Sequence, residues 1–589
     1  MRLPEMRYGD GLTKSTQVRF GGYDHRPGAG DGTLWDMENL TGDQFPLLAV
    51  RRPRRLDREL KQPGGLWAHN SLCWADGDGF FCDGKRVGTV IPGRKQFAGM
   101  GSRILIWPDK AVYDTVTGQF ERLEASVSLT GVSFRNGTLY GEEAERNTLY
   151  CAGVDFRELF SAGDAVTVSG CTRHPENNKT PIIREIDGDG HALRFYENVF
   201  ELDTGVDEKP RDYTEPGTVT VARTLPEMDF ICVNDNRLWG CKGDSIYCSK
   251  LGDPKNFNVF DGLGTDSFQV DAGSAGEFTA CVSFLGYPCF FKTDRIYKMY
   301  GDLPSNFQLM GSATLGVAPG SHGSLAVAGE TLFYLSPAGV VSYSGGIPSP
   351  IGTCFGEQRF SEGVAGSDGL KYYISMRDAG TDRARPQGSG RYQLFVYDSQ
   401  RGVWHREDET RAAGWACLDG TLYLLAEDGG LWQVNGNVSG SDTLEGPLGV
   451  PAQAQRSGLR GEEESQRSEM EFLSVDGNGM ERISALRWYA EFNDFTEGSP
   501  DARGYGKIQL RMELEAGSQV WVELKYDSED GWRRVSPVLT ATRKRTFLLP
   551  VIPRRADHFR LRLGGTGWCA VYSIAREFYG GSENRTVRL

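Results

Sequence analysis

Short apolar runs separated by glycine turns recur along most of this chain, and the pattern predicts strands rather than helices. Each run follows a Gly or Asn turn and a polar residue, and pairs a leucine with an aromatic residue, as at 236–239 (NRLW), 420–423 (GTLY) and 429–432 (GGLW). Aromatic residues suit strands, and Asp-Gly or Asn-Gly pairs favour tight hairpin turns. Recurring strand–turn–strand units of this kind predict a β-propeller, whose blades are four-stranded sheets.

The repeats place the propeller in residues 61–124 and 223–436. One blade takes about 40–45 residues, so this length predicts about six blades, with five or seven left open. A pair of β-sandwiches is the competing architecture. Between the two stretches, residues 125–222 do not show the recurring pattern of a turn, a polar residue, a leucine and an aromatic residue. Alternating positions such as Val166 and Val168 predict a small inserted β-domain there.

The chain after the repeats has two textures. Residues 437–468 are rich in Gly, Ser and Glu and poor in aromatics, which predicts a linker or an exposed loop. Strand-like alternation resumes from residue 469 and is clearest at Ile508, Leu510 and Met512, so residues 469–589 are expected to form a β-sandwich. The predicted fold is therefore all-β: a β-propeller of about six blades with an N-terminal extended arm, a small inserted β-domain and a C-terminal β-sandwich.

Residues 1–60 precede the repeats and are expected to form the extended arm. Within them, residues 20–55 combine glycine turns, isolated apolar residues and a basic run. A segment this rich in glycine cannot build its own core, so we expect it to lie across another domain or a neighbouring subunit, and its deletion to leave a folded monomer that no longer assembles. The candidate inter-subunit contacts are Gly21, Gly22, Trp35, Asp36, Asn39, Arg51, Arg52, Arg54 and Arg55.

Composition narrows the class of protein. A chain of 589 residues is too long for one core, so about two to four domains are expected. The net charge of −14 argues against a general nucleic-acid binder. The 12 cysteines are scattered without a CxxC pair, which favours reduced thiols packed as small apolar residues. We expect no signal peptide and no transmembrane helix, and a chain made in the cytoplasm.

Catalytic and metal-binding motifs were sought without a convincing match. The chain has no GxSxG, Walker A or HExxH motif, and its seven histidines are far apart. Asp187-Gly188-Asp189-Gly190 suggests a calcium loop, but His191 stands where a further oxygen ligand is needed, so a hairpin turn is favoured. We therefore expect no enzyme, no catalytic or metal-ligating residues and no cofactor.

Two basic clusters stand out in this acidic chain. The first is the run of arginines at 51–58. The second is a candidate docking cluster for acidic faces of neighbouring subunits, and a solvated face is the alternative. Its members are Arg543, Lys544, Arg545, Arg554 and Arg555.

Three separate patches resemble the tail nozzle proteins of short-tailed bacteriophages and their prophage relatives. The first patch has a Gly-Gly turn, a Gly-x-Asp stretch, an Asp-x-x-Asn element and a basic Arg-Arg-Pro ending. The second lies in the predicted propeller and the third near the end of the sandwich. The residues concerned are Gly21-Gly22, Gly30-Asp31-Gly32, Asp36-Met37-Glu38-Asn39, Arg51-Arg52-Pro53, 234–239, 249–257, 552–560 and 572–578.

The resemblance implies a structural virion protein, located in the tail and made in the host bacterial cytoplasm. Its copies would form a homo-oligomeric ring, with a hexamer as one candidate, around the DNA-exit channel. Its partners would be adaptor, portal and other tail proteins, with no membrane. DNA would pass without specific binding, which suits an acidic protein because a basic lining would attract the phosphate backbone. The alternatives are a tail-tip propeller that binds a receptor glycan and, less favoured, a propeller glycosidase.

Overall fold

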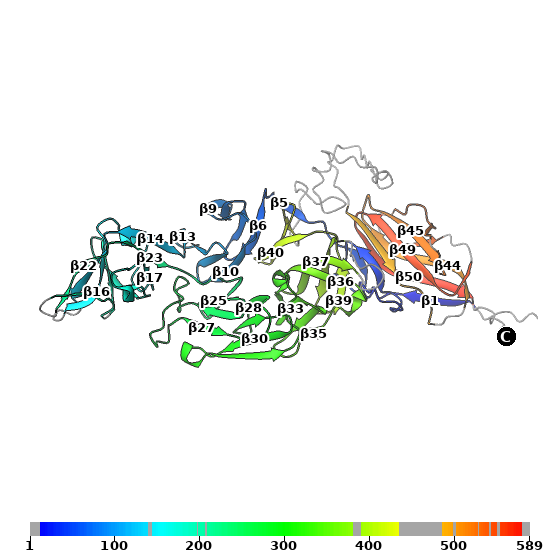
Figure 1. The fold of residues 1–589 in the computed structure, drawn as a ribbon. Helices are drawn as coiled ribbons and strands as arrows, with labels where there is room; N and C mark the ends of the chain where they lie inside the picture. Colours follow the sequence, from blue (N-terminus) through cyan, green and yellow to red (C-terminus); the bar gives the residue numbers. More distant parts are fainter. Residues whose placement is uncertain are drawn as a thin grey trace, which may run out of the picture. The chain divides into compact units, whose positions relative to one another are not determined.

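The computed structural model describes residues 12–138, 144–196, 198–205, 209–380, 390–434, 486–498, 502–527, 529, 531–540, 544–549 and 554–579. Within them the chain is all-β (Figure 1), with five short 3-10 helices between strands. These are η1 (Phe156–Glu158), η2 (Pro175–Asn177), η3 (Pro304–Asn306), η4 (His322–Ser324) and η5 (Thr353–Phe355). No helix in these ranges is long and apolar enough to cross a membrane.

Seven sheets of the described chain contain four antiparallel strands each, which is the blade structure of a β-propeller. The first three are β6 (Pro63–Ala68), β7 (Leu72–Asp76), β8 (Gly79–Cys82) and β9 (Lys85–Thr89); β10 (Gln96–Met100), β11 (Arg103–Trp107), β12 (Ala111–Asp114) and β13 (Phe120–Arg122); and β24 (Phe230–Asn234), β25 (Arg237–Lys242), β26 (Ser245–Cys248) and β27 (Phe268–Asp271).

The remaining four sheets follow the insertion or close the series. They are β28 (Ala280–Phe284), β29 (Tyr287–Phe291), β30 (Arg295–Tyr300) and β31 (Gln308–Ala313); β32 (Ala326–Ala328), β33 (Thr331–Ser336), β34 (Gly339–Tyr343) and β35 (Ser349–Pro350); β36 (Arg359–Ser367), β37 (Lys371–Gly380), β38 (Tyr392–Asp398) and β39 (Val403–Arg406); and β40 (Ala412–Leu418), β41 (Thr421–Ala426) and β42 (Gly430–Gln433) with β5 (Arg55–Glu59).

The number of blades lies within the range that the sequence left open, about six with five or seven as alternatives. The described residues form seven such sheets, because several blades are shorter than the average repeat and the last one borrows β5 from before the repeats. Tight turns between strands keep these blades short. Asp83-Gly84, Asp235-Asn236 and Asp419-Gly420 have positive φ at both residues, as two-residue type I′ hairpins require.

The chain forms two compact units. The continuous unit is His69–His322, and the discontinuous unit joins Met1–Ala68 to Gly323–Leu589. In the continuous unit, the expected inserted segment forms two larger sheets and a two-stranded one around an apolar core of its own. Their strands are β14 (Ala125–Thr130), β23 (Thr218–Arg223) and β17 (Thr167–Ser169); β18 (Ile183–Ile186), β19 (Ala192–Phe195), β16 (Ala144–Tyr150), β15 (Ser133–Thr138) and β22 (Tyr213–Thr214); and β20 (Asp203–Thr204) with β21 (Pro210–Arg211).

The discontinuous unit contains a β-sandwich built from both ends of the chain. One sheet comprises β3 (Leu40–Thr41), β4 (Leu48–Val50), β50 (Cys569–Tyr579), β44 (Arg503–Leu514) and β47 (Arg545–Leu549), with β1 (Thr13–Gln17) on β50 and β48 (Arg554–Ala556) on β44. The other comprises β2 (Leu34–Glu38), β43 (Arg487–Phe492), β49 (Phe559–Thr566), β45 (Gln519–Tyr526) and β46 (Arg533–Arg534). The expected linker at 437–468 lies outside the described residues.

The extended arm expected at residues 1–60 is corrected by this arrangement. In Figure 1, blue β1 runs beside red β50, and the register pairs Thr13 with Phe578. Strands β2 and β4 pair with β43 and β50, and β5 pairs with β42. The apolar residues Phe20, Tyr23 and Leu34 are buried in the same core as sandwich and blade residues. The glycine-rich segment finds its core within its own chain.

Candidate functional site: an arginine–carboxylate cluster beside a cleft

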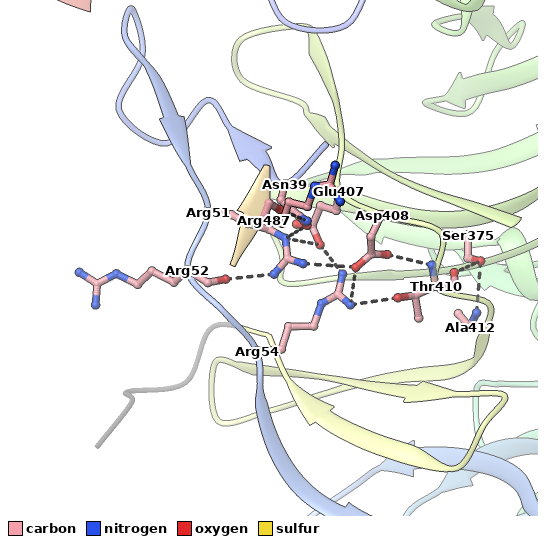
Figure 2. A network of polar contacts seen from close by, with 10 residues as sticks. All are labelled: Asn39, Arg51, Arg52, Arg54, Ser375, Glu407, Asp408, Thr410, Ala412 and Arg487. Atoms are coloured by element: carbon pink, nitrogen blue, oxygen red, sulfur yellow. Dashed lines mark hydrogen bonds and ion pairs between the residues drawn. The ribbon is translucent and has the colours of Figure 1, made fainter. Parts of the chain in front are cut away.

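A group of buried charged side chains in the discontinuous unit lies where the sandwich meets the blades. Residues 51–54 connect sandwich strand β4 to blade strand β5, and residues 407–411 connect β39 to β40. Both connections are short, and ion pairs join the side chains of one to those of the other. We call the group formed by Arg51, Arg54, Glu407 and Asp408 the arginine–carboxylate cluster (Figure 2).

Each arginine of the cluster bridges both carboxylates. Arg54 places one guanidinium nitrogen 2.7 Å from Glu407 Oε2 and another 2.9 Å from Asp408 Oδ2. Arg51 lies 3.2 Å from Asp408 Oδ2 and 3.6 Å from Glu407 Oε2. Thr410 completes the group, because its backbone N–H donates to Asp408 Oδ1 at 2.9 Å. Two cations therefore balance two anions.

All four charged side chains are buried, Arg54 with 1% of its side chain exposed and Asp408 with 5%. Burial by itself would raise the pKa of Asp408, but the guanidinium groups of Arg54 and Arg51 outweigh burial and lower that pKa. A buried ion pair stays ionised only when pairing and hydrogen bonds replace the lost hydration. The cluster meets this condition.

Asn39 joins the cluster to the sandwich. Its side-chain oxygen accepts from Arg51 Nε at 2.9 Å, and its side-chain nitrogen donates to the carbonyl of Arg487 at 2.8 Å. Its backbone N–H donates to the carbonyl of Glu407 at 2.7 Å. Asn39 adopts φ of 59°, a left-handed conformation that asparagine tolerates better than most residues. One residue thus connects β2, β43 and the cluster.

A second charge centre lies on the neighbouring strands, with Arg406 buried and its carboxylate partners partly exposed. Arg406 Nε donates to the carbonyl of Met37 at 2.6 Å and lies 3.2 Å from Asp36 Oδ1. The hydroxyl of Tyr489 donates to Asp36 Oδ2. Burial raises the pKa of Glu38 to about 7, while the nearby Arg406 guanidinium opposes that rise. The arm segment and blade strand β39 are therefore joined by two adjacent ionic centres.

A cleft of about 520 Å³ borders the cluster. The ammonium of Lys371 pairs with Asp43 across its wall, and Tyr373, Asp398, His405 and Trp568 also line it. His405 is only 6% exposed. Burial lowers the pKa of its imidazole to about 4, with the Lys371 charge acting in the same direction and the carboxylates of Asp43 and Asp398 opposing it. His405 is therefore neutral at physiological pH.

The residues proposed as inter-subunit contacts serve contacts inside the chain. Gly22 has φ of +76°, and an added Cβ would lie 2.5 Å from the carbonyl oxygen of Trp404, so only glycine fits there. The ring of Trp35 packs 3.9 Å from that of His25, centroid to centroid. Arg51 and Arg54 are buried in the cluster, and Arg55 opens β5. Among the cluster's neighbours, Arg52 has an exposed side chain, and Gly21 is half-buried.

The predicted docking cluster is spread along one sheet edge. Arg545 faces Met512 and Arg555 faces Gly504 on β44, about 27 Å apart at the usual strand rise. Lys544, Arg545 and Arg555 are exposed, and the Lys544 ammonium lies 3.3 Å from the ring centroid of Tyr572. Arg543 lies outside the described residues, and the side chain of Arg554 is not described.

Sequence reasoning missed Glu407 and Asp408, which follow a predicted strand but carry no motif. It also missed Asp527, Asp557 and His558, whose ligand-type atoms lie within 4.8 Å of one another on the sandwich surface. The suspected calcium loop is a hairpin turn, since the carbonyl of Gly188 accepts from Arg157 at 2.6 Å and Gly190 N–H donates to Asp187 at 3.0 Å.

The fold and this site define a β-propeller protein with a β-sandwich made from both chain ends and an inserted β-domain. No family model matches the chain, and no curated protein matches it. BamB from Moraxella catarrhalis is similar over 66% of this chain and 99% of its own, with 12% identity and a TM-score of 0.29. The computationally designed Ika8 protein is similar over 65% of this chain and 99% of its own, with 12% identity and a TM-score of 0.29. The phage phi92 endosialidase is similar over 66% of this chain and 63% of its own, with 9% identity and a TM-score of 0.20.

Proposed function

We propose that this chain is a structural, non-enzymatic subunit of a bacteriophage tail, which assembles with copies of itself into a ring around the DNA-exit channel. The observation that carries a structural role is the arginine–carboxylate cluster. Its ion pairs join the sandwich, the N-terminal strands and the last blade of one chain. The three patches of sequence resemblance support the tail as its location.

The chemistry of the cluster favours a structural role, in which it holds parts of the chain together, over general acid catalysis. A general acid needs a carboxyl group whose pKa is raised toward neutrality. The lowered pKa of Asp408 is the opposite of what a general acid needs, and Glu407 is held by two ion pairs. The proposal therefore assigns no catalytic residue and no cofactor to this site.

The net negative charge of the chain supports a role as a channel through which DNA passes without binding. Condensed counterions are released when basic groups meet DNA phosphates, so a basic channel would retain DNA. A chain with net charge −14 gives no such general attraction. Passing DNA would slide rather than bind, and the adaptor, portal and other tail proteins are the protein partners that we propose.

Negative-stain electron microscopy of the purified protein tests the ring, alone and with the portal and adaptor proteins of the same genome. We expect closed rings whose central hole is wider than a DNA duplex. An unrelated portal protein at the same concentration is the control. Monomers under every condition would contradict the proposal and turn attention to the glycan-binding alternative, which a glycan array tests.

A DNA-binding measurement tests the conduit separately. At physiological ionic strength we expect the assembled protein to bind duplex DNA no more tightly than an acidic control protein. Tight binding that weakens steeply with added salt would mean that phosphates are neutralised by the protein. That result would contradict a passive channel even if rings form.

A further inference from the structure

Two cysteines of the continuous unit face each other across a hairpin. Cys73 lies in β7 and Cys82 in β8, and the antiparallel register pairs them directly. The same register pairs Asp76 with Gly79 on either side of a two-residue loop. Both thiols are buried, Cys73 fully and Cys82 with 6% exposure.

The position of this pair in the ladder suits a covalent bond between the two side chains. Asp83 N–H donates to the carbonyl of Leu72 at 3.1 Å, so the Leu72–Asp83 pair is a hydrogen-bonded one. Pairs alternate along an antiparallel ladder, which makes Cys73–Cys82 a non-hydrogen-bonded pair, with Cα atoms about 4.5 Å apart. That separation lies inside the range in which disulfides form.

The sulfur atoms are already in contact. Cys73 Sγ and Cys82 Sγ lie 2.6 Å apart. By comparison, the hydroxyl of Ser71 lies 3.7 Å from Cys82 Sγ, an ordinary distance for a sulfur contact. A bond between the two sulfurs therefore needs no rearrangement of the hairpin.

We propose that Cys73 and Cys82 form a redox-modifiable pair, which closes an intrachain disulfide between β7 and β8 when the protein meets a peroxide. The Cys82 thiolate attacks one peroxide oxygen, the O–O bond breaks, and Cys82 becomes a sulfenic acid with release of hydroxide. Cys73 then attacks the sulfenic sulfur, the S–S bond forms and water leaves. Two thiols and one hydrogen peroxide thus give one disulfide and two waters.

The order of these steps follows from the contacts of Cys82. The hydrogen bond from the Cys73 thiol stabilises negative charge on Cys82 and lowers its pKa to about 7, with Ser71 assisting. The thiolate is the reactive form of cysteine. The same hydrogen bond and burial raise the pKa of Cys73, which makes it the resolving partner rather than the first nucleophile.

In the part of the chain that the structure describes, no other cysteine pairs directly with a cysteine across a ladder, although the Cys281 thiol makes side-chain hydrogen bonds with Cys232 and Cys241. Cys289 pairs with Val282, and burial raises its pKa to about 12. Cys232 pairs with Trp239. Cys417 is exposed and pairs with Leu422, so a peroxide can oxidise it without a facing thiol, and it has to be removed before the pair is tested.

The test is chemical mapping of the folded protein in a Cys417→Ser background, which removes the exposed thiol. The protein is treated with dilute hydrogen peroxide, quenched with catalase, denatured, alkylated and digested without reduction. Trypsin leaves both cysteines in one peptide, because no Lys or Arg lies between them, whereas a protease that cuts before Asp76 and Asp78 separates them. We expect two peptides that stay linked until a reductant is added, and two fewer free thiols.

Two variants check the mechanism. Cys73→Ser should accumulate a sulfenic acid at Cys82 that dimedone traps, and Cys82→Ser should leave Cys73 alkylatable. Should a variant fail to fold, the mapping of the Cys417→Ser protein decides alone. Complete alkylation of both cysteines after peroxide treatment would overturn the proposal. So would linkage of either cysteine to other thiols as often as to its neighbour.

Discussion

Arg51 and Arg54 stand three positions apart on the connection between β4 and β5, and both point into the protein. Their neighbour Arg52 has an exposed side chain. The difference lies in what faces them, because Glu407 and Asp408 approach from the connection after β39. Removing one partner of a buried pair leaves the other charge uncompensated, which costs far more than losing a surface ion pair.

Replacing Arg54 by methionine should therefore lower the free energy of unfolding by about 3–5 kcal/mol, because two buried carboxylates lose a shared cation. Urea unfolding followed by tryptophan fluorescence measures the change. Arg52→Met is the matched control and should change the free energy by less than about 0.5 kcal/mol, as expected for an exposed side chain. Equal effects of the two substitutions would show that the cluster does not hold the unit together.

His405 gives the cleft wall a pH dependence. Its pKa is about 4 in the folded protein and about 6.5 in an unfolded chain, so the unfolded state binds the proton more tightly. The stability gained from a neutral buried His405 is complete above pH 6.5 and is lost as the pH falls toward 4. The charges that act on it are the carboxylates of Asp43 and Asp398, the ammonium of Lys371 and the guanidinium of Arg401.

The substitution His405→Gln removes this titration. Between pH 7 and pH 4, the free energy of unfolding of the wild-type protein should fall by about 3 kcal/mol more than that of the variant. Chemical unfolding at several pH values measures the difference between the two proteins. Parallel stability curves would mean that His405 has the same pKa in the folded and the unfolded state.

The sequence predicted well at this scale only where local chemistry decides the outcome. The turn at Asp83-Gly84 follows from the positive φ that these residues accept. The role of Arg54 could not be predicted, since its partners come more than 350 positions later in the chain. A run of arginines is equally compatible with an exposed docking surface and with a buried ionic cluster until the facing carboxylates are known.

Among the elements, β5 has the largest consequence for the fold. It supplies the fourth strand of the last described blade, where Leu56 faces Trp432. Periodicity located the repeats but could not show that one blade is shared between chain segments far apart in sequence. The sandwich was likewise predicted as a C-terminal domain, whereas four N-terminal strands belong to it.

A chain that begins at residue 61 should therefore fail to fold, because β42, β43 and β50 lose the strands that pair with them. Unpaired edges template aggregation. We expect most of the truncated protein in the insoluble fraction after expression, and rapid proteolysis of the remainder. A chain that begins at Thr13 keeps β1 to β5 and is the control. A soluble, protease-resistant monomer from the shorter chain would restore the idea of a separable arm.

At the scale of the whole molecule, the exposed edge with Lys544 and Arg545 is one part of the predicted docking surface that the structure leaves accessible, and Arg555 is another. Strand β47 pairs with β44 along this edge. Lysine and arginine on an edge strand discourage unwanted strand addition, and they also suit an acidic partner surface.

The double variant Lys544→Glu/Arg545→Glu should keep the wild-type unfolding midpoint, because both side chains are exposed. It should reduce assembly with copies or tail partners at least tenfold, as sedimentation velocity at physiological ionic strength would measure. Lys85→Glu/Arg86→Glu, which changes two exposed residues of β9, is the control for net charge. Unchanged assembly in the Lys544→Glu/Arg545→Glu variant would exclude this edge from the interface.

The sharing of the last blade between β5 and β42 also governs how the protein emerges from the ribosome. Leu56 is synthesised long before its partner Trp432. At about 5–20 residues per second, the first segment waits roughly 20–75 s for that partner. During this interval β5 has no native edge to join, and β1, β2 and β4 wait longer still for β43 and β50, so unpaired strand edges are exposed on the nascent chain.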